Sequence, residues 1–327
     1  MMNLRSENDI IKNWTITENN LPFVSIVCHT FNQEKFIEQA IISFLNQKTT
    51  FSFEVIIHDD ASTDQTVSII KSYQQKYPSI IKLILQDENK YSKRISIWTN
   101  FTFPACKGKY IALCEGDDYW TDVEKLQKQV DFLESNQKYV ICWTDYLNFN
   151  GSTFQKNEFG FNEDVVTIDF NTIFNPYCTY SLTTVFLKSA LDLPLLSSLK
   201  RMKDNSLYCL LLKEGLGAFL NYKTAVYRIH EGGVYSLKSL YFQRYSSYLN
   251  LKEIYDVLPE SHTKNIEKTL QTLLRNAAFE ALKIKYTSNE ATEEQEGLLT
   301  SYFPKATFSV KLKYYKRILQ YRFLKKK

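Results

Sequence analysis

Alternation between apolar strands and amphipathic helices constrains the fold of this chain more than any other feature. Three segments are rich in β-branched and apolar residues, as buried strands are: FVSIVCHTFN, FEVIIHDDAS and IIKLIL. The two stretches between them, 34–47 and 64–77, place apolar residues at helical spacing. A strand, helix, strand, helix, strand order predicts a parallel sheet with crossover helices.

A fourth apolar segment, KYIALCEGDDYW, ends in three carboxylates, Glu115, Asp117 and Asp118. Carboxylates this close repel one another and raise each other's pKa, so the cluster is most stable when a cation lies among them. Ligands of open α/β sheets bind at the carboxyl ends of strands. The position after a strand therefore favours a cation site over a solvated acidic turn.

Beyond residue 121 the pattern predicts a helix over 122–135 and a strand over 139–143, and then becomes irregular. Two Ser/Thr-x-x-Glu/Gln sequences, at Ser62 and Thr121, predict capping boxes for the helices that follow them. From Leu237 onward only helical periodicity remains, which predicts two regions, 1–236 and 237–327. The further elements expected before that boundary are strands over 181–189 and 222–229, with a short helix over 205–215 between them.

Composition is that of a folded protein, with 44% hydrophobic residues and only 9 Gly and 7 Pro. No apolar run reaches the ~18 residues of a membrane span, and the first 20 residues are too polar for a signal peptide, so we expect a cytoplasmic protein. Six scattered cysteines without a C-x-x-C motif indicate reduced core residues. Neither G-x-G-x-x-G nor a P-loop sequence is present, which argues against the common dinucleotide and P-loop sites.

The basic character of the chain is concentrated at its end. Residues 311–327 hold eight of the 40 Lys and Arg residues and none of the 36 acidic ones. Aromatic and aliphatic residues alternate there with basic ones, which favours a helix that lies on an anionic membrane surface. Nucleic acid would suit the same charge, but no nucleic-acid-binding module is recognisable, so we expect none. A plain solvated helix end is the other alternative.

Four motifs together resemble the family 2 glycosyltransferases with a GT-A fold, especially bacterial members that build capsule, O-antigen or other surface polysaccharides. They are VSIVCHTFNQEKFIEQAIISFLNQ, FEVIIHDDASTDQT, GKYIALCEGDDYW and YRIHEGGVYS, and the resemblance covers about 22–236. It implies an α/β, Rossmann-like, mostly parallel sheet flanked by helices, with a helical C-terminal appendage. It also implies a nucleotide-sugar donor, usually a UDP-sugar, a saccharide or lipid-linked acceptor, and Mn²⁺ or Mg²⁺ beneath the diphosphate.

The resemblance assigns the metal and the diphosphate to the acidic segment and to YRIHEGG. EGDD is similar to the D-x-D element of the family. Either Asp118 or Asp117 would therefore ligate the metal, while the other would orient the donor. Glu115 stands where many relatives have Asp. Arg228 and His230 alternate on one strand and share a face. Arg228 suits the diphosphate because its donors match oxyanions, and His230 would complete the metal shell or bind phosphate.

The nucleobase is assigned to the first two strand ends. HDDAS is similar to the second nucleotide motif of the family, so Asp60 would accept a hydrogen bond from the base and Asp59 would support the loop. Thr30 and Phe31 would border the same base. We expect Trp120 to form a wall of the donor pocket.

Transfer with inversion, which the resemblance implies, needs a base for the acceptor hydroxyl. In similar proteins this base is an Asp downstream of the metal motif and just before a short helix, the place that Asp204 occupies. The alternative role for Asp204 is that of helix N-cap.

Two other functions remain open. One is a catalytically inactive protein that binds a nucleotide sugar or organises polysaccharide assembly. The other is a metal-dependent phosphohydrolase in which two ions are gathered by His58, Asp59, Asp60, Asp117, Asp118 and His230.

Overall fold

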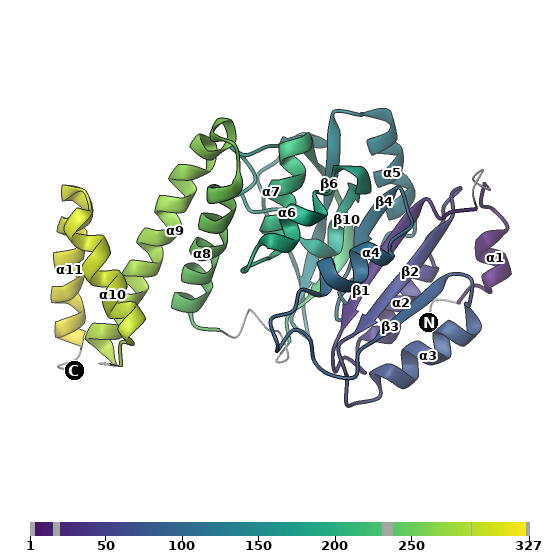
Figure 1. Cartoon of the computed structure of the whole chain (residues 1–327), viewed down its shortest axis with the longest axis horizontal. Helices are drawn as coiled ribbons and strands as arrows, with labels where there is room; N and C mark the ends of the chain where they lie inside the picture. Colours follow the sequence, from purple (N-terminus) through teal and green to yellow (C-terminus); the bar gives the residue numbers. More distant parts are fainter. Residues whose placement is uncertain (1–3, 16–19, 231–237, 289, 325–327) are drawn as a thin grey trace. The chain divides into compact units, whose positions relative to one another are not determined.

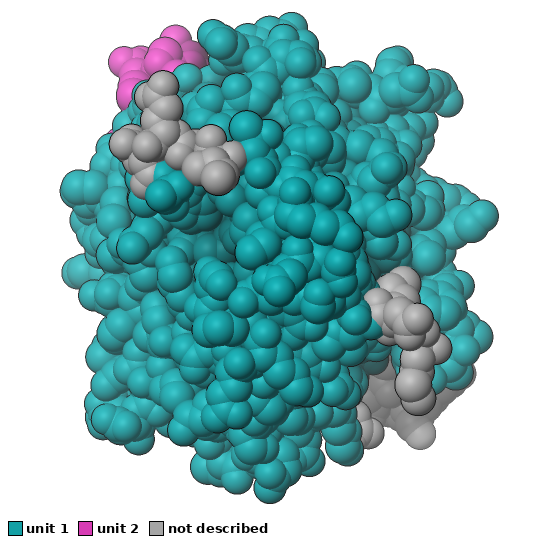
Figure 2. Space-filling model, turned by 90° about the vertical axis from the view of Figure 1, so that its right-hand side faces the viewer, with its two compact units in different colours: residues 1–230 teal, residues 231–327 magenta. Residues whose placement is uncertain are grey.

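A computed structural model describes residues 4–15, 20–230, 238–288 and 290–324 of the chain (Figure 1). It divides into two compact units, 1–230 and 231–327, which Figure 2 colours separately. The boundary predicted from the sequence, between residues 236 and 237, lies outside the described residues.

The first half of the large sheet in the first unit is parallel. Its strands pair in the order β3-β2-β1-β4, so the chain moves outward from β1 to β3 and then returns to the other side of β1 for β4. The reversal makes the ends of β1 and β4 a topological switch point, where α/β sheets bind ligands. The strands are β1 (Val24–Thr30), β2 (Phe53–Asp59), β3 (Ile81–Leu85) and β4 (Tyr110–Leu113).

Beyond β4 the sheet is mixed rather than parallel throughout. The short strand β9 is antiparallel to both β4 and β6, whereas β6 and β10 are parallel to each other. Three short antiparallel strands complete it: β5 and β8 pair with β10, and β7 pairs with β6. The bounds are β5 (Tyr119–Trp120), β6 (Tyr139–Phe149), β7 (Phe154–Lys156), β8 (Val165–Ile168), β9 (Val185–Leu187) and β10 (Leu216–Arg228).

The strand predicted over 181–189 is shorter than expected. Only β9 is extended, with 3-10 turns over Ser181–Thr183 and Lys188–Ala190 on either side. The hydroxyls of Thr183 and Thr184 donate to the carbonyl of Tyr180, at 2.9 and 3.0 Å. Such local side-chain bonds stabilise a turn at the expense of the strand.

Helices cover both faces of this sheet. Cys142 of β6 belongs to the core cluster shared with α2, α3 and α5, whereas its neighbour Trp143 packs edge-on against Tyr208 of α7, with ring centroids 5.2 Å apart. Successive strand residues point to opposite faces, so α7 lies across the sheet from α2. The helices are α1 (Glu7–Ile11), α2 (Ile37–Leu45), α3 (Thr66–Lys76), η1 (Trp98–Thr102), α4 (Phe103–Ala105), α5 (Lys125–Ser135), α6 (Leu193–Ser198) and α7 (Asp204–Glu214).

Neither predicted capping box forms. The helix α3 begins at Thr66 after Gln65 without a side-chain cap, because the Ser62 hydroxyl accepts the backbone N–H of Asn32 at 2.8 Å and the Gln65 N–H donates to Glu34 Oε2 at 2.9 Å. The helix α5 begins at Lys125, and the nearby Glu124 N–H is accepted by Asp122 Oδ1 at 2.9 Å. In both places another carboxylate, that of Glu34 or of Asp122, accepts the N–H group that the capping box would use.

The second unit is helical, as predicted. Small residues of α9, Ala277, Ala278 and Ala281, are fully buried in its core, which allows neighbouring helices to approach closely. No helix among the described residues is both long and apolar enough to cross a bilayer. The helices are α8 (Leu240–Val257), α9 (Glu260–Thr287), α10 (Glu293–Tyr302), η4 (Phe303–Lys305) and α11 (Phe308–Leu324).

Candidate active site

Asp59 and Asp60, at the end of β2, are buried and hydrogen-bonded. The Asp59 carboxylate accepts the backbone N–H of Ser62 at 2.9 Å and its hydroxyl at 2.5 Å. The Asp60 N–H donates to the carbonyl of Thr30 at 3.1 Å, which joins the ends of β1 and β2. Asp59 thus stabilises the loop that follows β2, and its part in nucleotide binding stays a prediction.

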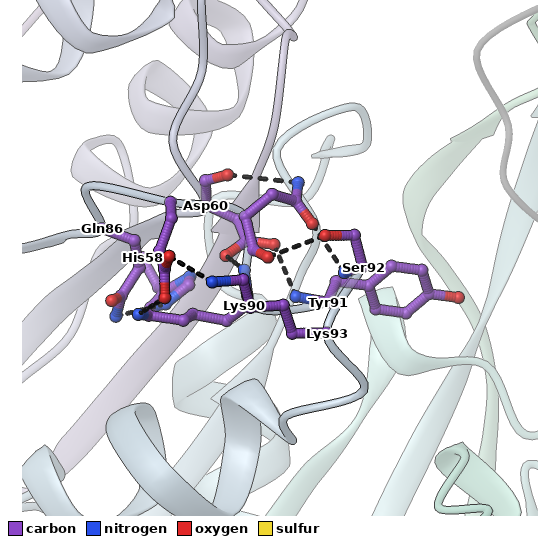
Figure 3. Close-up of polar contacts among 9 residues, drawn as sticks. His58, Asp60, Gln86, Lys90, Tyr91, Ser92 and Lys93 are labelled. Carbon is purple, nitrogen blue, oxygen red and sulfur yellow. Dashed lines mark hydrogen bonds and ion pairs between the residues drawn. The ribbon is translucent and has the colours of Figure 1, made fainter.

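The carboxylate of Asp60 anchors a loop from a later part of the chain (Figure 3). Its two oxygens accept the backbone N–H groups of Lys90 and Tyr91, at 2.7 and 3.0 Å. The Asn89 side chain donates to the Asp60 carbonyl at 3.2 Å. Hydrogen bonds to an ionised acceptor are among the stronger ones in proteins, so Asp60 fixes the 89–91 turn beside the end of β2. Its contact with a nucleobase stays a prediction.

Thr30 and Phe31, at the end of β1, are available to a ligand in different ways. The Thr30 hydroxyl is buried and has no hydrogen-bond partner among the described residues. The Phe31 side chain is 44% exposed. A buried hydroxyl without a partner is costly, and an exposed ring offers a stacking surface, so both fit the border of a polar aromatic ligand.

The acidic segment after β4 runs directly beside the end of β1. The N–H groups of Cys114 and Gly116 donate to the carbonyls of Val27 and His29, at 3.1 and 2.9 Å. A Cβ atom at Gly116 would lie 2.5 Å from Gln33 Oε1 and 3.0 Å from the Cβ of Thr30. A larger residue would require the Gln33 side chain to move and would crowd Thr30, so glycine favours this approach, which brings the three carboxylates next to the polar ends of β1 and β2.

Glu115 and Asp118 lie in surroundings that disfavour their charged, deprotonated forms. Burial, and next the charge of Asp204, raise the pKa of Glu115 to about 8, although Ser181 Oγ donates to its Oε2 at 2.8 Å. Burial and then the charges of Asp117 and Glu115 raise the pKa of Asp118 well above its ordinary value. Asp118 Oδ1 also accepts the backbone N–H of Arg228 at 2.8 Å. The charge of Asp204 thus acts on the cluster, and its role as the base stays a prediction.

Arg228 and His230, at the end of β10, both contact Asp117. Asp117 Oδ2 lies 3.0 Å from His230 Nε2, and its carbonyl accepts from Arg228 Nη1 at 2.5 Å. The Arg228 guanidinium also donates to Gln39 and lies 4.3 Å from the ring centroid of Tyr119. These contacts hold the guanidinium beside the carboxylates.

Two sequence predictions about single residues need correction. Trp120 is 3% exposed, donates from its indole to the Leu182 carbonyl at 2.8 Å, and packs on Phe44. It is a core residue and not a pocket wall. Asp204 is the first residue of α7 and Lys203 is the N-cap, so the alternative role of Asp204 as the cap is wrong.

The side chains near this site fit a metal ion that is bound partly by the phosphates of a substrate better than one bound by protein ligands alone. Within the described part of the chain, no group of three or more His, Cys, Asp or Glu side chains is arranged to hold an ion. This applies both to the six-residue, two-ion set of a phosphohydrolase and to the set of Asp117, Asp118, Glu115 and His230 expected from the resemblance. Mg²⁺ bound to substrate phosphates commonly needs only one or two protein carboxylates. Asp117 and Asp118 fit that requirement, because a cation would relieve their mutual repulsion.

Sequence reasoning missed Ser181 and Gln39. Ser181 lies 66 residues from Glu115 along the chain, and Gln39 lies 189 residues from Arg228. Ser181 lies outside the four motifs, and Gln39, although it lies within the first motif, is an ordinary polar residue of a helical pattern, so no signal in the sequence marked either residue.

Comparison with known proteins agrees with this fold. The profile described as Glycosyl transferase family 2 matches residues 25–190. The chain belongs to this family.

Two relatives and one solved structure show the range of similarity. The uncharacterized protein Rv1520 of Mycobacterium tuberculosis is 45% identical over 122 residues, which are 37% of this chain and 34% of Rv1520. The chain therefore matches about a third of the length of Rv1520. The UDP-Glc:alpha-D-GlcNAc-diphosphoundecaprenol beta-1,3-glucosyltransferase WfaP of Escherichia coli is 28% identical over 222 residues, 65% of this chain and 80% of WfaP. Residues 1–349 of S. aureus TarS in complex with UDP-GlcNAc superpose with a TM-score of 0.62 at 18% identity, covering 93% of this chain and 90% of that one. At this identity TarS supports the GT-A fold alone.

Proposed function

We propose that the chain transfers a sugar from a nucleotide-sugar donor, a UDP-sugar, to a saccharide or lipid-linked saccharide in bacterial cell-surface polysaccharide synthesis. The observation that carries the proposal is the meeting of Asp117, Asp118, Arg228 and Asp204 beside the ends of β1 and β2. Family membership supports it, and WfaP is named for a UDP-glucose donor and a lipid-linked acceptor. The transferase site lies in the first unit, 1–230.

The donor would bind across the switch point. Thr30 and Phe31 would border the base, and Asp60 would hold the 89–91 turn against it while accepting from the base. Arg228 would bind the diphosphate, and Asp117 and Asp118, with His230 and Glu115 beside them, would hold Mn²⁺ or Mg²⁺. A divalent cation there would supply charge neutralisation for the departing diphosphate.

Asp204 would act as the base. Burial raises the pKa of its carboxyl, which brings a carboxylate closer to the basicity that proton abstraction from a hydroxyl needs. The acceptor oxygen would attack the anomeric carbon on the face away from the diphosphate, and its proton would pass to Asp204. The C–O bond to the diphosphate breaks as the new one forms, so the configuration of the transferred hexosyl group inverts.

Isothermal titration of the whole chain with UDP, GDP and CMP, each with Mn²⁺ and with chelator, tests this function. We expect metal-dependent binding of UDP, and loss of that binding in Asp118→Ala but not in Asp131→Ala, an exposed aspartate of α5. Binding of none of the three nucleotides with metal present would refute the proposal.

We further propose that the enzyme works at the inner face of the cytoplasmic membrane through 311–327 and the start of α11. Phe308, Leu312, Tyr315 and Leu319 repeat every three to four residues and are 82, 62, 62 and 58% exposed. Ile318, on another face of the same helix, is buried in the core of the unit. The exposed apolar stripe therefore does not serve the helical core, and the lysines of this helix suit anionic lipid.

Flotation with vesicles tests this contact. The chain should float with vesicles that contain 30% phosphatidylglycerol, an amount chosen as roughly that of an anionic leaflet, and not with pure phosphatidylcholine. Leu312→Glu should abolish flotation, whereas Gln320→Glu, at an exposed position of the same helix, should weaken it only slightly. Equal flotation of both variants would contradict a role for the stripe.

A further inference from the structure

Four tyrosines form a continuous cluster of rings in the first unit. Tyr180 is at its centre, with ring centroids 4.6 Å from Tyr146, 5.3 Å from Tyr177 and 5.9 Å from Tyr227. Tyr146 is 2% exposed and Tyr177 is 38% exposed. The cluster thus runs from the core to the surface and ends in an accessible ring.

Three of the tyrosines, Tyr177, Tyr180 and Tyr227, are connected to the acidic cluster through a neighbouring residue or through its charge. The Tyr177 hydroxyl donates to Asn205 Oδ1 at 3.4 Å, and Asn205 follows the candidate base Asp204. Tyr180 precedes Ser181, whose hydroxyl donates to Glu115. Tyr227 precedes Arg228, and its pKa is raised by burial and then by the charges of Asp118 and Asp117. The rings therefore border the groups that would carry out transfer.

The cluster lies away from the residues assigned to the nucleobase. Tyr146 and Tyr227 are on β6 and β10, whereas Asp60 and Thr30 follow β2 and β1. In the sheet, β4 and β9 separate these two pairs of strands. The acidic segment follows β4, between them, so the tyrosines lie on the side of the carboxylates opposite the base.

We propose that Tyr177, Tyr180 and Tyr227 form an acceptor subsite that binds a saccharide ring, with Tyr177 as its exposed stacking surface. This inference rests on the proposed glycosyl transfer and adds the acceptor side of the site. A sugar ring has an apolar face of C–H groups and a rim of hydroxyls. Tyrosine rings match the face at a low cost in side-chain entropy, and their hydroxyls, with Asn205 nearby, match the rim.

The same chemistry argues against a lipid chain at this place. Three phenolic hydroxyls and the adjacent carboxylates would leave polar groups without partners against hydrocarbon. A saccharide supplies donors and acceptors for them. The acceptor hydroxyl would then lie near Asp204, which is where proton removal requires it.

The test compares acceptor use with nucleotide binding in Tyr177→Ala, Tyr177→Phe and Phe154→Ala, the last an exposed aromatic of β7 as the matched control. The acceptor probes are p-nitrophenyl β-glucoside and p-nitrophenyl N-acetyl-β-glucosaminide, with UDP-glucose and UDP-N-acetylglucosamine as donors and Mn²⁺. We expect Tyr177→Ala to raise the acceptor KM about tenfold, since one aromatic contact contributes up to about that factor. Tyr177→Phe and Phe154→Ala should stay within about twofold of wild type, and the Kd for UDP should be unchanged in all three.

An acceptor KM in Tyr177→Ala equal to that of the wild type would overturn the inference. The inference would also be overturned if the wild-type chain bound UDP with Mn²⁺ but used neither glycoside as an acceptor. Failure of the proposed function is a different result, because the wild type would then not bind UDP with metal at all.

Discussion

Carboxylates lie at the ends of β2 and β4, at the same edge of the sheet, but their surroundings differ. Hydrogen-bond donors stabilise the charged form at the end of β2, whereas burial and neighbouring carboxylates disfavour it after β4. After β2, Asp59 and Asp60 each accept two hydrogen bonds from nearby N–H or O–H groups. After β4, Glu115 and Asp118 are next to other carboxylates, which together with burial raise their pKa values. The same residue type thus stabilises a loop at one strand end, whereas at the other its charged form is disfavoured by its surroundings.

The difference shows where a ligand is needed. The carboxylates after β2 are satisfied within the chain, so their removal should cost mainly stability. Those after β4 are costly without a partner, and natural proteins retain such cost mainly at functional sites. Each prediction below changes one of the two sets, or a residue beside it, and measures which property responds.

The largest effect is expected for Asp204→Asn, beside the set after β4. Asparagine keeps the shape of the side chain but cannot take a proton, so the transfer rate should fall by about a thousandfold. Binding of UDP with Mn²⁺, measured by titration, should stay within about twofold of the wild type, because Asp204 is not assigned to the donor. The rate is read as release of UDP in the presence of acceptor.

Asp131→Asn, on the exposed side of α5, is the control for that variant. Wild-type turnover in Asp204→Asn would show that Asp204 is not the base. The carboxylates after β4 would then bind the donor without taking part in proton transfer.

The next effect is expected for Asp60→Ala, in the set after β2. The change leaves the N–H groups of Lys90 and Tyr91 without their acceptor, which should lower the free energy of unfolding by about 3 kcal/mol. Urea unfolding measures it, with Asp87→Ala, an exposed aspartate of the same loop, as control within about 0.5 kcal/mol. A loss of nucleotide binding without loss of stability would contradict the structural role.

How much of this could be read from the sequence differs between the two halves of the sheet. The parallel half was predicted well, because continuous apolar runs such as VSIVC and EVII, bounded by helical patterns, define strands buried on both faces. The mixed half was predicted poorly. Threonine hydroxyls that bond to Tyr180 shorten β9, and β6 and β10 extend beyond their apolar cores into polar residues.

The candidate site shows the same limit. Residues at strand ends were found because the ends of neighbouring strands meet at one edge. Their partners were not, since the contacts of Ser181 and Gln39 depend on tertiary packing across the chain. Trp120 was misassigned because an aromatic residue after a strand has the same sequence pattern in a core and in a pocket.

The smallest effect is expected for Glu115→Gln, on the free energy of unfolding. The pH dependence of this effect shows whether the charged form of Glu115 destabilises the folded chain. The folded pKa of Glu115, about 8, is above the ordinary value of 4.5, so the folded state keeps a proton that the unfolded state has already released. Stability of the wild type should therefore fall, relative to the variant, as pH rises from 4.5 through 8, and the difference should then level off. Glu115 is partly exposed, so we expect the full difference to be about 2 kcal/mol, less than the shift alone would give.

Urea unfolding in chelator at pH 5, 7 and 9 measures it, and Glu293→Gln, at the start of α10 in the second unit, is the control. Parallel pH curves for Glu115→Gln and wild type would mean that the carboxylates after β4 are as well compensated as those after β2.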